Sequence, residues 1–591
     1  MNRTASVAPV EQFTRCVKPL VASVYEPLGI DVEALCDRIV ELISPHYHVD
    51  LSEQTTQWSQ ADTLLITYGN SICNVASETP LQTLSRFLSE HLQDTVTGVH
   101  ILPFFPYSSD DGFAVIDYLQ VNPELGDWED ISRIANQFDL MTDLVINHIS
   151  SQSQWFQEFK RDDAPGRDYF ITVAPESDLT YVVRPRNTPL LCPVETSAGL
   201  KHVWATFSHD QIDLNMANPD VLIEFLRIIL YYLDTGARIL RLDAIGYLWK
   251  SPGTSCIHLP ETHTLIKLIR EIVSLVNPAA ILVTETNVPN RENLTYFGNR
   301  NEAHLIYNFS LPPLIVNALY QERSEHLQTW MMSMPPAPFG CAYLNFTASH
   351  DGIGLRPTEG LLEQTEYDTF LQCIQDFGGK ISMRTRPDGA ESPYEANISL
   401  FDALKGTAKG EDTWQIPRFI CSQVIMMSLE GIPAFYVHSL LATPNDHDAV
   451  KQTGRNRSIN RHQWDYDALI TQLKQSDSNQ AIVFEELSRL IKIRRQQAAF
   501  HPNATQYTLH LQPTLFAFWR QSMTRDQSIF SIHNLTPRSQ TLLLRDLNLI
   551  VTDSWFDLIS ETVIPEGATE FILKPYQSAW ITNKFDRVSV F

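Results

Sequence analysis

Polar residues that could act on a sugar follow short apolar segments at four places along the chain. They are Asp143, Asn147 and His148, then Arg241 and Asp243, then Glu285, and finally His350 and Asp351. In a parallel α/β barrel, residues that directly follow the strands meet at one mouth. Cleavage of a glycosidic bond needs one carboxylate beside the anomeric carbon and a protonated carboxyl group beside the leaving oxygen. The set therefore favours glycosyl transfer over metal or phosphoryl chemistry.

Each of these residues also has a structural interpretation. An aspartate after a strand is commonly a helix N-cap, and a histidine at a strand end is commonly a hydrogen-bonded structural residue. We expect Asp143 in particular to be structural and to orient its neighbours. The catalytic interpretation rests on four separate strand ends that all carry suitable residue types.

Eight apolar segments have the length and composition of strands, and most are separated by stretches with helical periodicity. They begin at Asp62, Gly98, Leu140, Ala237, Ala279, Ala303, Ala342 and Pro433. This alternation predicts an α/β fold, a (β/α)8 TIM barrel.

Two gaps between these segments are too long for a simple crossover. They predict an inserted subdomain after the third strand, about 149–212, and an excursion after the seventh strand, about 352–410, within a catalytic barrel over 61–500. Residues 1–60 are expected to form a helical extension, with an amphipathic helix over Val32–Ile43. Alternating segments over 501–591 predict a C-terminal all-β domain.

The charge balance limits the possible partners. With 44 Lys and Arg against 69 Asp and Glu, the 591-residue chain has a net charge of −25, which argues against a nucleic-acid partner. An anionic substrate would have to be attracted by a local basic pocket. The eight cysteines form no C-x-x-C pair, and the N-terminus lacks an apolar signal segment. No run of about 20 apolar residues suggests a membrane span. We therefore expect a cytoplasmic protein.

The sequence also has few features of a bound cofactor. It contains no Gly-rich phosphate loop of a nucleotide site. It also has no dedicated carboxylate cluster for a metal. We expect no cofactor and no metal, and the sequence carries no signal for an oligomeric state.

Four segments resemble the signature regions of the α-amylase superfamily. DLVINH, RILRLDA, LVTET and ASHD match these regions in order. The resemblance implies a retaining double displacement with Asp243 as nucleophile, Glu285 as general acid and then base, and Asp351 as stabiliser of the transition state. Arg241 would hold Asp243 ionised, because a nearby cation lowers the pKa of a carboxyl group.

Further segments are similar to the sucrose phosphorylase group of that superfamily. They are GVHILPFFPYSSDDGF, VVRPR, VWATFSHDQIDL, RLDAIGY, GTSC and RSINRH. The resemblance implies a substrate site that includes Asp110, Phe113, His148, Phe207, Gln211, Tyr247, His350 and Arg457. It assigns Arg186 to phosphate, which suits the donor fork of a guanidinium. A surface salt bridge is the alternative for Arg186.

Three features depart from sucrose phosphorylases themselves. Asn287 stands where they have a histidine, the loop RPTEGLL differs, and the chain has an N-terminal extension. These features resemble the glucosylglycerate phosphorylase branch, which implies a sugar substrate and inorganic phosphate as co-substrate, with α-glucose 1-phosphate as product. A sucrose or glucosylglycerol phosphorylase, an α-glucosidase and an inactive binding module are the alternatives.

Arg356, in the segment SHDGIGLRPTEGLL, is the last predicted site residue. The glycines and the proline set a bend that could bring this cation to the acceptor side of the pocket. There it would pair with glycerate or phosphate, whereas sucrose offers it no anion. The structural alternative is a bond from Arg356 to a loop carbonyl or to Glu359.

Overall fold

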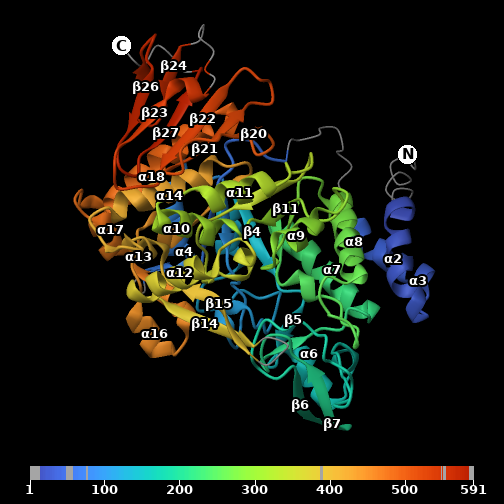
Figure 1. Cartoon of the computed structure of the whole chain (residues 1–591). Helices are drawn as coiled ribbons and strands as arrows, with labels where there is room; N and C mark the ends of the chain where they lie inside the picture. The colour runs from blue at the N-terminus through green and yellow to red at the C-terminus, as the bar shows by residue number, and fades with distance from the viewer. Residues whose placement is uncertain are drawn as a thin grey trace.

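The computed structural model describes residues 13–47, 57–74, 78–385, 390–547, 549 and 554–584 (Figure 1). At its centre, eight parallel strands form a closed barrel. In chain order they are β1 (Leu64–Thr67), β3 (Gly98–Ile101), β4 (Asp139–Leu144), β9 (Ala237–Leu242), β10 (Ile281–Thr284), β11 (Leu305–Tyr307), β12 (Ala342–Asn345) and β18 (Ile432–Tyr436). The predicted (β/α)8 barrel is confirmed.

The barrel strands are mostly apolar and are buried on both faces. Every residue of β1, β3, β10 and β12 is buried, because helices cover the outside of the barrel and side chains fill its interior. The outer helices include α7 (Pro219–Asp234) and α8 (Pro260–Val276), which each bury an apolar stripe. The turn into α7 is fixed by Asn218, whose side chain accepts a hydrogen bond from the backbone N–H of Asp220.

The segment after β4 places two polar residues side by side. Strands β5 (His148–Ser150) and β8 (Gln211–Asp213) pair antiparallel. Between them lie α6 (Gln154–Arg161) and the hairpin of β6 (Leu191–Thr196) and β7 (Gly199–Trp204), which projects away from the barrel (Figure 1). The β5–β8 pairing brings Gln211 next to the segment that carries His148.

The segment after β12 forms a small antiparallel sheet in the order β13-β15-β14. Its strands are β13 (Ile353–Gly354), β14 (Lys380–Thr385) and β15 (Glu391–Asn397), and Gly354 is paired with Glu395. Both long gaps in the barrel pattern thus contain short strands.

Helices α2 (Lys18–Tyr25) and α3 (Val32–Ile43) lie against the outer helices α8 and α7, respectively (Figure 1). The predicted helix over Val32–Ile43 is confirmed. The Tyr25 hydroxyl donates to the carbonyl of Met216 at 3.0 Å and so ties the extension to the barrel. Residues 1–12 and 48–56 of the predicted helical extension lie outside the described residues.

The C-terminal segment folds as an antiparallel sheet in the order β20-β21-β22-β27-β24-β25. These strands are β20 (Thr505–Thr508), β21 (Leu515–Gln521), β22 (Ser528–Asn534), β27 (Ser578–Thr582), β24 (Trp555–Asp557) and β25 (Thr562–Ile564). It has an apolar core of its own that includes Leu515, Ile532 and Ile581.

The eight cysteines are free thiols. Within the ranges given above, no helix is both long and apolar enough to cross a membrane. The same ranges contain no group of three His, Cys, Asp or Glu side chains arranged to hold a metal ion.

Candidate active site

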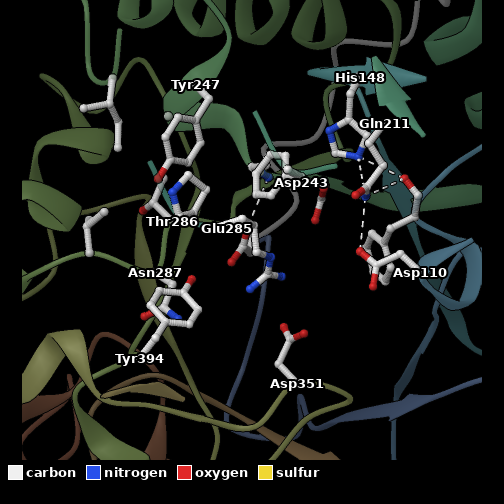
Figure 2. A pocket seen from close by; sticks show the side chains of 18 of the residues that line it. Asp110, His148, Gln211, Asp243, Tyr247, Glu285, Thr286, Asn287, Asp351 and Tyr394 are labelled. Atoms are coloured by element: carbon white, nitrogen blue, oxygen red, sulfur yellow. Dashed lines mark hydrogen bonds between the residues drawn. The ribbon is translucent and has the colours of Figure 1, made fainter. Parts of the chain in front are cut away.

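One pocket at the carboxyl ends of the barrel strands collects every predicted site residue except Arg356. These residues are Asp110, Phe113, His148, Arg186, Phe207, Gln211, Arg241, Asp243, Tyr247, Glu285, His350, Asp351 and Arg457. Figure 2 shows Asp110, His148 and Gln211 on one side of Asp243 and Glu285, and Tyr247, Asn287 and Tyr394 on the other. We call the first the Asp110 side. The second is the Arg186 side, since Arg186 lies over the ring of Tyr394 at 5.7 Å.

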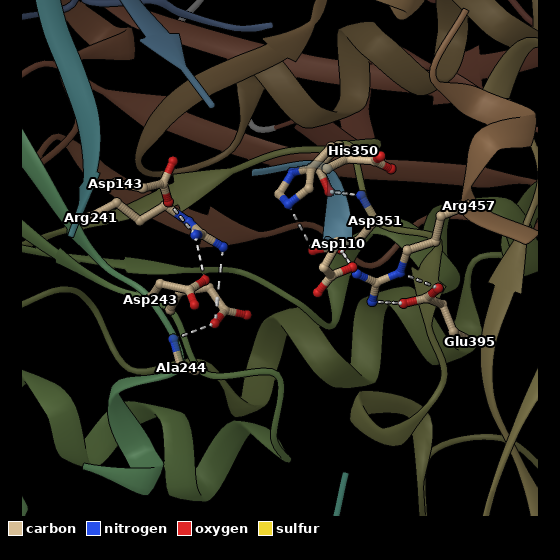
Figure 3. A network of polar contacts seen from close by, with 12 residues as sticks. Asp110, Asp143, Arg241, Asp243, Ala244, His350, Asp351, Glu395 and Arg457 are labelled. Carbon is tan, nitrogen blue, oxygen red and sulfur yellow. Dashed lines mark hydrogen bonds and ion pairs between the residues drawn. The ribbon is translucent and has the colours of Figure 1, made fainter. Parts of the chain in front are cut away.

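Asp243 and Glu285 share the buried guanidinium of Arg241, and Figure 3 shows its contact with Asp243. Nη1 of Arg241 lies 2.7 Å from Oδ1 of Asp243, and Nη2 lies 4.0 Å from Oε2 of Glu285. The backbone N–H of Ala244 donates to the same Oε2 at 3.0 Å. Because both electropositive partners of Glu285 face Oε2, a proton on this group is favoured on Oε1.

Asp143 anchors this arginine from below the pocket, as the sequence predicted for a structural residue. Its Oδ1 accepts a hydrogen bond from Nη1 of Arg241, and its Oδ2 lies 2.7 Å from Nε2 of His100. Asp143 is fully buried. Burial acts to raise its pKa, but Arg241 and His100 outweigh burial and lower the pKa below the ordinary value.

The pKa values of the two shared carboxyl groups depend on burial as well as on Arg241. Burial raises the pKa of Asp243 well above its ordinary value and outweighs Arg241, which lowers this pKa as expected, and the charge of Glu285 raises it further. Burial also raises the pKa of Glu285. The pair therefore tends to keep one proton, and the closer contact of Arg241 with Asp243 favours that proton on Glu285.

Asp351 belongs to a second chain of charges (Figure 3). Nη1 of Arg457 lies 2.5 Å from its Oδ1, and Arg457 also holds Glu395 through two hydrogen bonds, Nη2 to Oε2 at 2.6 Å and Nε to Oε1 at 3.0 Å. Although burial opposes it, Arg457 and Arg461 lower the pKa of Asp351. Asp351 is therefore held as a carboxylate.

The other residues of the Asp110 side are also joined to one another. Gln211 donates from Nε2 to Oδ2 of Asp110 at 3.1 Å and lies 3.2 Å from Nε2 of His148. The same His148 nitrogen donates to the carbonyl of Phe113 at 2.9 Å. The Phe113 ring stacks on His350 at 5.0 Å. Such a group of fixed acceptors, donors and an aromatic face suits the hydroxyls and the ring of a sugar.

The Arg186 side differs from the Asp110 side because fewer of its charged groups form ion pairs or hydrogen bonds. Within the described ranges, neither Arg186 nor Arg356 forms a side-chain hydrogen bond or ion pair, and Nε of Arg356 is buried without a partner. The proposed partner of Arg356, Glu359, is bonded to Arg384 at 2.8 Å. Arg356 does not line the pocket, but its charge acts on two lining residues, Tyr247 and His258.

Aromatic rings form the walls of this side. Phe207 packs edge-on against Tyr247 at 5.6 Å, and its other neighbour is His148 at 5.1 Å. Both Phe207 and Tyr247, which the resemblance assigns to the aromatic walls of the glucose site, line the pocket. His258 is held by Tyr296 and Glu292, with its Nδ1 at 2.5 Å and its Nε2 at 3.2 Å from their oxygens.

Sequence reasoning missed several pocket residues and one anchor. The lining residues are Pro185, Ala244, Gly246, Ile257, His258, Thr286, Val288 and Tyr394, and the anchor is Glu395. Tyr394 and Glu395 lie on β15, far from the end of any barrel strand in the sequence. A search for polar residues that directly follow barrel strands therefore could not find them. The alternating segment ESPYEANI was the one signal that a strand presents side chains there.

Comparisons with known proteins place the chain among enzymes with this kind of barrel. Residues 90–351 match the model of the α-amylase catalytic domain. A glucosylglycerate phosphorylase of Spirochaeta thermophila is 45% identical over 535 residues, covering 89% of this chain and 90% of that protein. One of Escherichia coli is 39% identical over 526 residues, covering 89% and 92%.

A solved structure agrees with these matches. The crystal structure of sucrose 6F-phosphate phosphorylase from Thermoanaerobacter thermosaccharolyticum superposes with a TM-score of 0.70 at 26% identity, covering 81% of this chain and 96% of that chain. The chain therefore belongs to the α-amylase family. Within it, the chain is a member of the sucrose phosphorylase-like group.

Proposed function

We propose that this protein is a retaining glucoside phosphorylase that converts glucosylglycerate and phosphate into α-glucose 1-phosphate and glycerate. The glucosyl residue would bind on the Asp110 side. Glycerate and phosphate would bind in turn on the Arg186 side. The names of the relatives at 45% and 39% identity support the substrate, and the polar groups of the pocket support the chemistry.

In the first half of the reaction, a carboxylate oxygen of Asp243 attacks the anomeric carbon. Glu285 donates its proton to the leaving glycosidic oxygen, and glycerate departs. The products of this step are a β-glucosyl ester of Asp243 and an ionised Glu285. Asp351, held as a carboxylate by Arg457, stabilises the positive charge that develops on the sugar ring.

In the second half, an oxygen of phosphate attacks the same carbon and the ester bond to Asp243 breaks. Glu285 takes up the proton of the attacking phosphate and is ready for the next turnover. Two inversions at one carbon give net retention, so an α-glucoside gives the α-anomer of glucose 1-phosphate.

The observation that carries the choice of an anionic acceptor is that the guanidinium groups of the Arg186 side form no ion pair with any described residue. In the described part of the chain, Arg186 lines the pocket without an ion-pair partner, and the charge of Arg356 reaches two lining residues. Both glycerate and phosphate are anions that a guanidinium binds through a fork of donors. Sucrose and glucosylglycerol leave a neutral acceptor.

The experiment is a comparison of donors. The purified protein is incubated with glucosylglycerate, sucrose or glucosylglycerol, each with and without phosphate, and both glucose 1-phosphate and free glucose are measured. We expect phosphate-dependent glucose 1-phosphate from glucosylglycerate, and far less from the other two glucosides.

Other results would contradict the proposal. Release from sucrose alone would show that the acceptor is wrong. Free glucose at equal rates with and without phosphate would identify a hydrolase. Inactivity with all three glucosides would favour a binding module.

A further inference from the structure

The Arg186 side contains a buried carbonyl oxygen that lacks a hydrogen-bond donor. It is Oδ1 of Asn287, which has no partner within the described ranges, although the residue lines the pocket two positions after Glu285. Its neighbour Thr286 also lines the pocket, but the Thr286 hydroxyl already donates to Asn293 at 2.8 Å. Since buried polar groups are almost always hydrogen-bonded in proteins, the Asn287 oxygen is suited to a donor from a ligand.

Gly354 fixes the position of this amide. A methyl group added at Gly354 would lie 2.8 Å from Nδ2 and 2.9 Å from Oδ1 of Asn287, which is closer than side-chain carbons approach such atoms. The amide thus lies directly on the backbone of Gly354. That backbone is itself paired with Glu395 of β15, the residue that holds Arg457.

The same short segment brings a cation to this side of the pocket. Arg356 follows Gly354 by two residues, in a 3-10 turn that begins directly after Leu355. The segment from Gly354 to Arg356 therefore supports two groups of different chemistry. One is an uncharged hydrogen-bond acceptor, and the other is a positive charge.

We propose that Asn287 determines acceptor specificity by accepting a hydrogen bond from a hydroxyl group of the acceptor. This inference rests on the proposed function. In glycerate, one oxygen is the leaving group and the carboxylate is attracted by the arginines, so the C3 hydroxyl is the donor that remains for Asn287. The preferred acceptors are therefore small hydroxy acids that carry a second hydroxyl group. Lactate, which is glycerate without that hydroxyl, should be rejected, because a site built to bond a hydroxyl discriminates strongly against its absence.

The test uses the synthetic direction with glucose 1-phosphate as donor. Phosphate release gives kcat/KM for glycerate and for lactate of the same configuration. The value for glycerate divided by the value for lactate is then compared between variants. We expect the unchanged protein to prefer glycerate by about tenfold or more. Asn287→Leu should bring the ratio close to one, mainly through loss of activity with glycerate.

Two further variants make the result specific. Gly354→Ala should lower the ratio in the same way, because its methyl group displaces the Asn287 amide. Asn299→Leu changes an exposed asparagine outside the pocket and should keep the ratio. A ratio that Asn287→Leu and Gly354→Ala both leave unchanged would overturn the inference, as would equal use of glycerate and lactate by the unchanged protein. Turnover with neither acid, together with turnover of a neutral acceptor, would instead mean that the proposed function itself fails.

Discussion

The two sides of the pocket differ in how far their polar groups are already satisfied. On the Asp110 side, Gln211 bonds Asp110 and adjoins His148, and beside it Arg457 links Asp351 to Glu395. On the Arg186 side, two guanidinium groups have no ion-pair partner among the described residues, and a buried amide oxygen has no donor. The first side is a rigid, preorganised receptor. On the second side, the unpaired guanidinium groups and the amide oxygen remain able to bond an anion and a hydroxyl group of a ligand.

The difference suggests a division of work. Under the proposed function, the fixed hydrogen bonds of the Asp110 side would bind the same glucosyl residue in both halves of the reaction. The Arg186 side would accept two different anions in turn, which requires that its guanidinium groups are not already paired with carboxylates of the protein. Mutations on the two sides should therefore differ in whether their effect depends on the acceptor.

The largest effect is expected at the group that both half-reactions share. Asp243→Asn removes the carboxylate that forms the glucosyl ester, so we expect turnover to fall by at least about 10⁴-fold with every donor and acceptor. Glucose 1-phosphate release from glucosylglycerate requires both half-reactions. Exchange of labelled phosphate into glucose 1-phosphate requires the second half-reaction alone. Residual turnover near the original rate in either assay would refute the assignment of the nucleophile.

A smaller loss that is the same for all acceptors is expected at Glu395. Glu395→Gln removes a charged partner of Arg457, which in turn holds Asp351. We expect kcat/KM to fall by about ten- to hundredfold, the range for loss of a hydrogen bond between charged groups. The assay compares glycerate with glycerol as acceptors of the glucosyl residue from glucose 1-phosphate.

A matched control is available in the same segment of the chain. Glu359→Gln alters an exposed glutamate that pairs with Arg384, away from the pocket, and should retain activity. If Glu395→Gln lowered kcat/KM for glycerate much more than kcat/KM for glycerol, Glu395 would act on the acceptor and would not belong with the Asp110 side.

Arg356 should give a smaller and selective effect. Arg356→Ala removes a positive charge that no described residue neutralises, so kcat/KM for glycerate should fall by about tenfold while that for neutral glycerol changes little. Arg384→Ala is the control, because that cation already pairs with Glu359. Equal losses with both acceptors would show that Arg356 supports the loop and does not select an anion.

The sequence was sufficient for the barrel, because apolar strands can be recognised from local composition. Asp243 and Glu285 directly follow such strands, and Asp351 lies on the segment after β12.

Most other pocket residues came from the resemblance, since no local pattern marks them. They are Asp110, Phe113, Arg186, Phe207, Gln211, Tyr247 and Arg457.

What could not be predicted depends on contacts between distant segments. The bond from Arg457 to Glu395 joins residues 62 positions apart, and nothing local marks either as the partner of the other. The net pKa of Asp243 depends on how far burial outweighs Arg241, which a sequence does not reveal. The role of Gly354 likewise appears only when the amide of Asn287 is seen lying on it.

The smallest expected effect concerns His350, a buried histidine of the Asp110 side. Burial lowers its pKa well below the ordinary value, and Arg461, Arg241 and Arg457 lower it further although Asp143 opposes them. In the folded protein it therefore stays neutral at pH 5.5, while in the unfolded chain, with a pKa near 6.5, it binds a proton. Because the unfolded state binds more protons, stability falls as the pH drops below about 6.5, by about 1.4 kcal/mol at pH 5.5 for one such residue.

Thermal unfolding at pH 7.5 and pH 5.5 tests this. Burial also lowers the pKa of His438 and of His533, each to about 3, so the unfolding midpoint of the unchanged protein should drop markedly over this range. His350→Asn should lower the midpoint at both pH values but make the drop between them smaller. The same change at exposed His447, on α16 (His447–Thr453), is the control and should preserve the full drop. An undiminished drop in His350→Asn would mean that His350 gains its proton in the folded state. The Asp110 side would then not be a fixed receptor across this pH range.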